Sequence, residues 1–406
     1  MKYARYGAVF AVLLLSNTFN GNAFAASSEI EALKSQMNAM QKRIKQLEEA
    51  EAKSSAEVRT KAVPSQPAAA KATNQGNPAI SVIGNFTGQR IRGSNGVQSS
   101  SFLPLSEAEF VFAADIDPHA RLDVTVTGAD GGMAVEEGYI TAYLPNAFNL
   151  KAGRKFLPVG RVNEVHPHAL IYADRPNGLV NLFGPEPFVG DGLLIDRPFF
   201  IGDSVQTLTA GFFGTENDVA FDPTGTSQYA GLARWSGVWD VTDNATLELG
   251  ATYIQGKNGI VPSGSLTRLA SSHLAWKQQN ANRSGLNIEA EWIRRWQEQG
   301  GGSTLVTDGS YLLADVAFNR SWHLFSRFDY SRERDAVTRI LTAEKAISAG
   351  AVWRLSEFQS LTLQYKHTRD ALTEMAGDLG IAAGGRANAW FFRWVVAIGP
   401  HGAHPY

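Results

Sequence analysis

Residues 79–406 contain sixteen short stretches in which apolar and polar side chains alternate. In residues 286–292 the apolar set is Leu286, Ile288, Ala290 and Trp292, and every residue between them is polar. Successive side chains of a strand point to opposite faces, so such a strand lies between an apolar phase and water. A soluble sheet could contain one or two of these strands. Sixteen in series favour an all-β protein with a closed antiparallel transmembrane barrel over residues 79–406.

The N-terminus has the three parts of a secretory leader. Lys2 and Arg5 supply positive charge, residues 8–15 are apolar, and residues 23–25 read Ala-Phe-Ala. This pattern predicts a signal peptide over residues 1–25. A single-pass anchor is the alternative, but the apolar core is too short to cross a bilayer.

Composition narrows the function further. The chain has no cysteine, which excludes disulfides and thiolate metal sites. Its formal charge of −2 gives no signal for a nucleic-acid partner. No later apolar run reaches the roughly 20 residues of a membrane helix, and a mean hydropathy of −0.17 is compatible with strands that are apolar on one face.

Two segments precede the predicted barrel. Residues 26–51 carry apolar residues at heptad spacing, which predicts a short α-helical coiled coil that forms when chains associate. Its core positions are Ile30, Leu33, Met37, Met40, Ile44 and Leu47. A single amphipathic helix on a surface is the alternative. Residues 52–78 are rich in Ala, Ser, Lys and Pro and are expected to form a flexible linker.

The expected strands are joined by connections of two kinds. Six connections are long: 93–106, 155–189, 217–229, 256–267, 298–309 and 370–388. In bacterial outer-membrane barrels the short turns face the periplasm and the long loops face outward. The sixteen strands are expected at 80–87, 107–116, 119–127, 134–144, 149–155, 190–196, 205–213, 230–240, 245–254, 268–277, 285–294, 310–318, 322–331, 346–355, 361–368 and 389–398.

The polar faces of these strands would line a wet interior. The charges expected in that lumen are Glu107, Glu109, Asp123, Arg234, Glu248, Glu289, Glu291, Arg327, Asp329, Lys366 and Arg393. A soluble barrel would reverse the two faces. The leader, the number of strands and the aromatic residues near strand ends favour the membrane barrel.

One segment resembles a known family. Residues 153–161 read Gly-Arg-Lys-Phe-Leu-Pro-Val-Gly-Arg, similar to the G-x-F-x-x-P-x-G stretch of the phosphate-selective porin O and P family, with the Phe one place later. Residues 136–140 and 149–153 also resemble the strands that precede that stretch. The resemblance implies a trimeric sixteen-stranded porin with a periplasmic coiled coil and an inward third loop. Phosphate selectivity is not implied, because the expected lumen charges have both signs, and a mixed or weakly cation-preferring channel fits them at least as well.

The connection 155–189 is the expected constriction, because long loops of this kind are usually functional. With the end of its preceding strand, it supplies Arg154, Lys155, Arg161, Glu164, His166, His168, Asp174 and Arg175. A solvated outer loop is the alternative. The apolar residues of the connection argue against that alternative, because they need a surface to pack on.

Catalysis and metal binding have weak signals. His166 and His168 form one close pair, and His401 and His404 form another. Such pairs are plausible zinc, copper or nickel ligands, but the two would lie on opposite sides of the membrane and could not share an ion. The sequence therefore assigns no metal site, cofactor or enzymatic activity.

The expected function is a diffusion porin, a homotrimer, in contact with the lipid of a Gram-negative outer membrane. Two alternatives stay open. One is a structural anchor that reaches the peptidoglycan through a periplasmic coiled coil. The other is a metal or chelate uptake receptor.

Overall fold

The computed structural model describes residues 78–94, 96–129, 131–215, 217–221, 228–260 and 264–399. The expected signal peptide, the coiled coil, nearly all of the linker, and His401 and His404 lie outside these residues. Within them, no helix has the length and apolar character needed to cross a bilayer.

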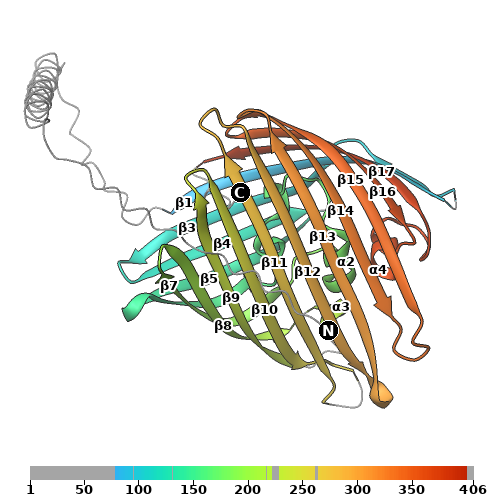
Figure 1. Ribbon diagram of the computed structural model, residues 1–406, viewed down its shortest axis with the longest axis horizontal. Coiled ribbons are helices and arrows are strands. Elements are labelled where there is room, and N and C mark those ends of the chain that lie inside the picture. Colours follow the sequence, from blue (N-terminus) through green and yellow to red (C-terminus); the bar gives the residue numbers. More distant parts are fainter. Residues whose placement is uncertain are drawn as a thin grey trace, which may run out of the picture. The chain divides into compact units, whose positions relative to one another are not determined.

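Sixteen long strands form a closed antiparallel ring (Figure 1). Each pairs with its neighbours in the chain, and β1 closes the ring by pairing with both β3 and β17. The short strand β2 (Gln98–Ser101) pairs with β1 beyond the point where β3 begins. The ring strands are β1 (Ala79–Gly93), β3 (Leu105–Asp117), β4 (Ala120–Ala129), β5 (Gly132–Leu144), β6 (Phe148–Phe156), β7 (Val189–Ile201), β8 (Ser204–Thr215), β9 (Gln228–Thr242), β10 (Ala245–Lys257), β11 (Leu266–Gln279), β12 (Gly285–Gln299), β13 (Ser303–Ala317), β14 (Trp322–Arg334), β15 (Leu341–Ser356), β16 (Gln359–Arg369) and β17 (Ala387–Ile398).

The ring has a turn end and a loop end. At the turn end the connections are short: 118–119, 145–147, 202–203, 243–244, 280–284, 318–321 and 357–358. The connections 157–188, 335–340 and 370–386 lie at the loop end. The start of β1 and the last residues of β17 both lie at the turn end, because Val82 pairs with Ile398. This is the arrangement expected for an even number of strands.

All sixteen predicted strands are present, but one predicted long loop is wrong. Residues 298–309 form the ends of β12 and β13, joined by the tight turn η4 (Gly300–Gly302). The glycines and polar residues suggested a loop, yet Thr307 is fully buried on the inner face. A strand that faces a polar interior can itself be polar, so composition alone did not distinguish it from a loop.

The two faces of the strands differ as the alternation predicts. Trp292 and Trp390 are exposed on the outer face, 37% and 50% respectively, whereas Glu289 and Glu291 are buried on the inner face. Aromatic pairs stack on the outer face near both ends, as in Trp322–Trp353 at the turn end and Phe212–Tyr229 at the loop end. Aromatic side chains gathered near both rims are typical of membrane barrels.

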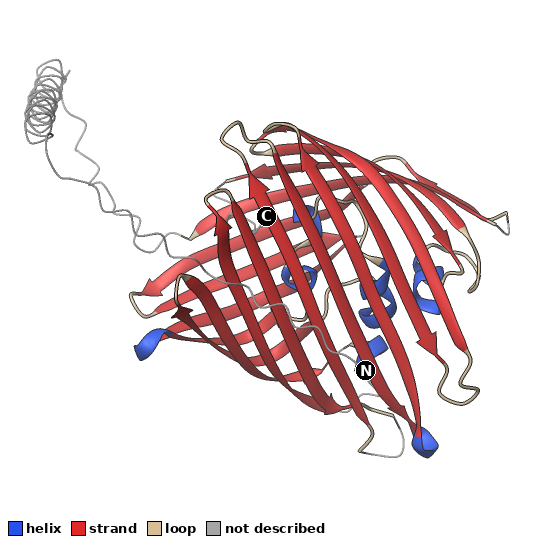
Figure 2. Ribbon diagram, in the orientation of Figure 1, coloured by secondary structure: helices blue, strands red, loops and turns tan. Residues whose placement is uncertain are grey.

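The prediction of a polar interior is wrong for part of the inner face. Apolar side chains of the ring strands pack there against apolar side chains of residues 157–188 and form a hydrophobic core. Figure 2 shows helices inside the ring of strands. Packing apolar side chains together removes them from water, so this part of the interior is filled rather than wet. The ring strands contribute Phe213, Leu232, Ile254, Leu269, Ile293, Tyr311, Leu313, Phe325 and Val352 to this core.

Candidate pore constriction

The segment 157–188, here called the inner loop, connects β6 to β7 inside the barrel. It contains η2 (Val162–Glu164), η3 (Pro167–Ala169) and the helix α2 (Asn177–Phe183), and every residue of α2 is buried. Gly178 allows α2 to touch β13, because a Cβ atom there would lie 2.8 Å from the Cα atom of Gly309. The alternative of a solvated outer loop is therefore wrong for these residues, because they are buried.

Arg161 joins the inner loop to β10 and β12. Its guanidinium lies 2.9 Å from Glu289 and 3.3 Å from Glu248, and its backbone N–H donates to Glu291 over 3.1 Å. Gly160 makes this approach possible. It has φ +65°, and a Cβ atom would lie 1.9 Å from a carboxylate oxygen of Glu291.

Asp174 joins the inner loop to β14 and β16. Its carboxylate lies 3.0 Å from Arg327 and 2.6 Å from Lys366, and Arg327 also contacts Asp329 over 3.1 Å. Arg327 lies over the ring of Tyr172, 4.3 Å from its centroid. Burial by itself would raise the pKa of Asp174, but Arg327 and Lys366 outweigh it and hold the pKa below its usual value.

Two further predicted lumen cations hold the inner loop. Arg234 lies 3.2 Å from Glu164, and Arg393 donates to the backbone oxygen of Pro167 over 3.0 Å. Arg234 neutralises a carboxylate of the inner loop and Arg393 binds its backbone, so both side chains anchor the loop to the barrel wall.

Two predicted constriction residues occupy other environments. Arg154 lies on the opposite face of β6 from Lys155 and pairs with Asp191 over 3.0 Å. Arg175 is buried within the inner loop, where it donates to Asn163 over 3.2 Å, and burial lowers its pKa to about 10. Neither side chain lines the open cavity described below.

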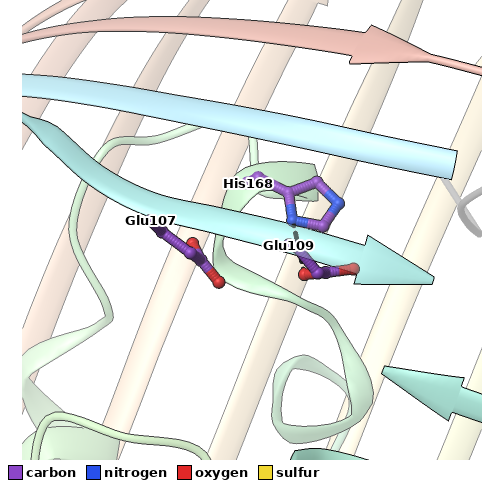
Figure 3. A group of neighbouring side chains, drawn as sticks. All are labelled: Glu107, Glu109 and His168. Atoms are coloured by element: carbon purple, nitrogen blue, oxygen red, sulfur yellow. Dashed lines mark ion pairs between the residues drawn. The ribbon is translucent and has the colours of Figure 1, made fainter. Parts of the chain in front are cut away.

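A second group of charges surrounds the two histidines of the inner loop. His166 lies between three carboxylates, 3.2 Å from Glu109, 3.3 Å from Glu136 and 3.0 Å from Glu137. His168 Nδ1 lies 3.1 Å from the same Glu109 oxygen. Figure 3 shows this ion pair and the neighbouring Glu107. Burial by itself would lower the pKa of His166, but the surrounding carboxylates outweigh it and raise the pKa to about 12.

A β-bulge explains how two neighbouring acids reach this group. Thr125 pairs with Glu137 and Val126 pairs with Val135, so Glu136 is an extra residue in β5. A bulge redirects side chains locally, and both Glu136 and Glu137 contact His166. Sequence reasoning did not assign these two acids a role, although adjacent acidic residues within an alternating strand were a visible signal.

An open cavity of about 1240 Å³ lies between the inner loop and the turn end of the barrel. On the inner-loop side Arg161, His168 and Tyr172 line it. Five basic side chains and three acidic ones face it, so positive charge is in modest excess. They are Arg161, Lys277, Arg283, Arg320 and Arg354, with Glu289, Asp315 and Glu357.

Comparison with known proteins identifies the fold but no family. No protein-family model matches the chain. It is 25% identical to an uncharacterized protein of Aquifex aeolicus (strain VF5) over 339 residues, which cover 74% of this chain and 70% of that protein.

The similar solved structures are outer-membrane proteins. An anion-selective porin from Comamonas acidovorans has a TM-score of 0.54 at 12% identity, covering 79% of this chain and all of the porin. The channel DcaP of Acinetobacter baumannii has a TM-score of 0.53 at 8% identity, covering 80% and 98%. The trimer form of OmpT from Vibrio cholerae has a TM-score of 0.53 at 10% identity, covering 79% and 100%. The chain therefore has the sixteen-stranded barrel fold of outer-membrane porins.

Proposed function

We propose that this chain is a porin of a Gram-negative outer membrane, through which small hydrophilic solutes or ions diffuse. The observation that carries the proposal is the cavity of about 1240 Å³ inside a porin-like barrel, bounded on one side by the charged inner loop. The inner loop would narrow the passage, and Arg161 would be its main charged group on the cavity side. The role proposed is passive diffusion, with no enzymatic activity and no cofactor.

The proposed orientation places the turn end in the periplasm. The predicted signal peptide and the expected coiled coil over residues 26–51 fit this orientation, because β1 begins at the turn end. A homotrimer is proposed on the likeness to the trimer form of OmpT. Chemical cross-linking of the purified chain tests it, and a single monomer band would contradict it.

Weak ion selectivity is proposed in place of phosphate selectivity. The cavity carries a modest excess of basic side chains, whereas the group around His166 is rich in carboxylates. Fields of opposite sign along one path partly cancel for a permeating ion.

Single-channel recording in planar bilayers tests the porin function, and Arg161→Ala tests the constriction. At a distance of roughly 6 Å in water, the charge of Arg161 changes the energy of a passing monovalent ion by about 0.7 kcal/mol, with opposite sign for a cation and an anion. Loss of the Arg161 charge should therefore raise the cation-to-anion permeability ratio about fourfold to tenfold. The lower figure applies near 0.1 M salt, because salt screens the charge. Reversal potentials in a KCl gradient measure this ratio.

Arg175→Ala is the matched control, because it removes the same charge from the same loop but from a buried position away from the cavity. Its permeability ratio should stay close to that of the parent chain. An unchanged ratio in Arg161→Ala would contradict the role of Arg161, and a chain without conductance would contradict the porin function.

A structural anchor is the second candidate, and the apolar core inside the barrel favours it. Phe188, Leu182 and Tyr172 of the inner loop are almost fully buried, so the loop fills part of the interior. A barrel closed by this core would serve to hold the N-terminal segment at the membrane. Absence of conductance in a correctly folded chain would support the anchor.

A further inference from the structure

Three side chains from two separate segments converge where the inner loop meets β3. Glu107 and Glu109 come from β3, and His168 comes from η3 (Figure 3). Their exposed fractions are 9%, 2% and 6%, and one ligand-type atom from each lies within 4.8 Å of the other two. The group therefore combines an imidazole and two carboxylates, withdrawn from bulk water.

The charge of the surroundings favours a bound cation. Glu136 and Glu137 bring the local number of carboxylates to four, whereas two basic groups contact Glu137 in the described part of the chain, Lys155 at 3.3 Å and His166 at 3.0 Å. Carboxylates gathered in a poorly solvated site repel one another unless cations or protons neutralise them. Oxygen Oε2 of Glu109 lies at the centre and is fully buried, with Nδ1 of His166 at 3.2 Å and Nδ1 of His168 at 3.1 Å.

The distances suit a metal ion of the zinc class. Bonds from Zn²⁺ to imidazole nitrogen or carboxylate oxygen are about 2.0–2.2 Å, so two ligand atoms of one ion lie at most about 4.3 Å apart. Glu109 Oε2 and His168 Nδ1 are already 3.1 Å apart. Small rotations of Glu107 and Glu109 would complete the set.

We propose that Glu107, Glu109 and His168 form a binding site for a borderline divalent cation such as Zn²⁺. Three protein ligands leave a coordination position for water, as in exchangeable zinc sites. His168 also lines the open cavity, which provides a route for the ion. The two histidine pairs by themselves indicated no metal site, because the carboxylates of β3 join His168 only in the folded chain.

The site is tested by titrating the metal-free, detergent-folded full-length chain with Zn²⁺ in a calorimeter. The double substitution His401→Ala and His404→Ala is made in every sample, so that these two histidines cannot contribute. We expect one Zn²⁺ per chain. Glu109→Gln and His168→Ala should each weaken binding by more than about 100-fold. Substituting residues that only hydrogen-bond to metal ligands already lowers metal affinity about 10–100-fold.

His367→Ala is the matched control, because His367 is a histidine at the loop end that contacts Asn388 and lies outside the group. It should bind Zn²⁺ as the parent does. The shift in electrophoretic mobility on heating reports whether each variant is folded. Wild-type affinity in both Glu109→Gln and His168→Ala would overturn the proposal, as would no binding to the parent at 100 µM Zn²⁺.

Electron paramagnetic resonance of bound Cu²⁺ keeps the proposal testable if a variant does not fold. In the parent with His401→Ala and His404→Ala, the spectrum should show nitrogen hyperfine structure from at least one imidazole. A spectrum of oxygen ligands only would exclude His168 and overturn the site. Neither measurement depends on conductance, so the site and the porin function can fail separately.

Discussion

Asp174→Asn tests whether the ion pairs that anchor the inner loop hold it in place. The substitution preserves the shape of the side chain but removes the charge that faces Arg327 and Lys366, which are 0% and 1% exposed as side chains. Breaking a buried ion pair by removing one partner costs about 3–5 kcal/mol. Arg327 keeps Asp329 as a partner, so we expect the lower figure.

A cost of about 3 kcal/mol corresponds to roughly a 100-fold larger population of chains with the inner loop detached. A detached loop of roughly thirty residues could extend by about 100 Å and leave the barrel. Trypsin can then cut after Arg161, which Val162 follows, but not after Arg175, because Pro176 follows it. When opening is faster than cleavage, the rate of proteolysis follows the open population, so cleavage should accelerate about 100-fold.

Mass spectrometry of the digest identifies the cut sites, and Asp203→Asn is the control. Asp203 is an exposed acid in the turn between β7 and β8, so its substitution should leave the rate unchanged. If Asp174→Asn is cut as slowly as the parent, the ion pairs do not hold the loop, and the reasoning is refuted.

Acid gives a second test of the same carboxylate. The pKa of Asp174 is lower in the folded chain than in the unfolded chain, where it is about 3.9. Its stabilisation is therefore present above about pH 3.9 and is lost as the pH falls through the folded value. The difference in heat-modification midpoint between the parent and Asp174→Asn should be nearly as large at pH 4 as at pH 7. Loss of that difference at pH 4 would contradict the lowered pKa.

Two further substitutions test the packing of the inner loop. Gly160→Ala should lower the heat-modification midpoint more than Gly202→Ala. Both glycines have a positive φ, and another residue in this conformation is strained by about 1–3 kcal/mol. Only at position 160 would the added Cβ atom also collide with Glu291. Equal shifts would mean that Glu291 yields at no cost. Phe188→Ala should cost about 3–5 kcal/mol, because Phe188 is fully buried, whereas Phe200→Ala should cost little, since Phe200 is 75% exposed. A similar midpoint in these two variants would show that the core does not stabilise the barrel.

The number and order of the strands followed from local patterns. Alternation involves residues two apart, so residues 286–292 carry the evidence for their own strand without reference to the rest of the chain. The prediction was wrong at residues 298–309, where polar strand ends look like a loop. It also missed the bulge at Glu136, because a bulge depends on the pairing between β4 and β5.

The sequence by itself therefore determined a barrel of sixteen strands with an apolar outer face. Only the tertiary structure decided what fills that barrel. Asp174 meets Lys366, and Gly160 meets Ser271, across more than a hundred residues of chain, and no local spacing encodes such contacts. The same folding brings Glu109 to His168 and turns part of the expected wet face into an apolar core. Period-two alternation tells which face a side chain takes, whereas the partner on that face depends on where a long connection comes to rest.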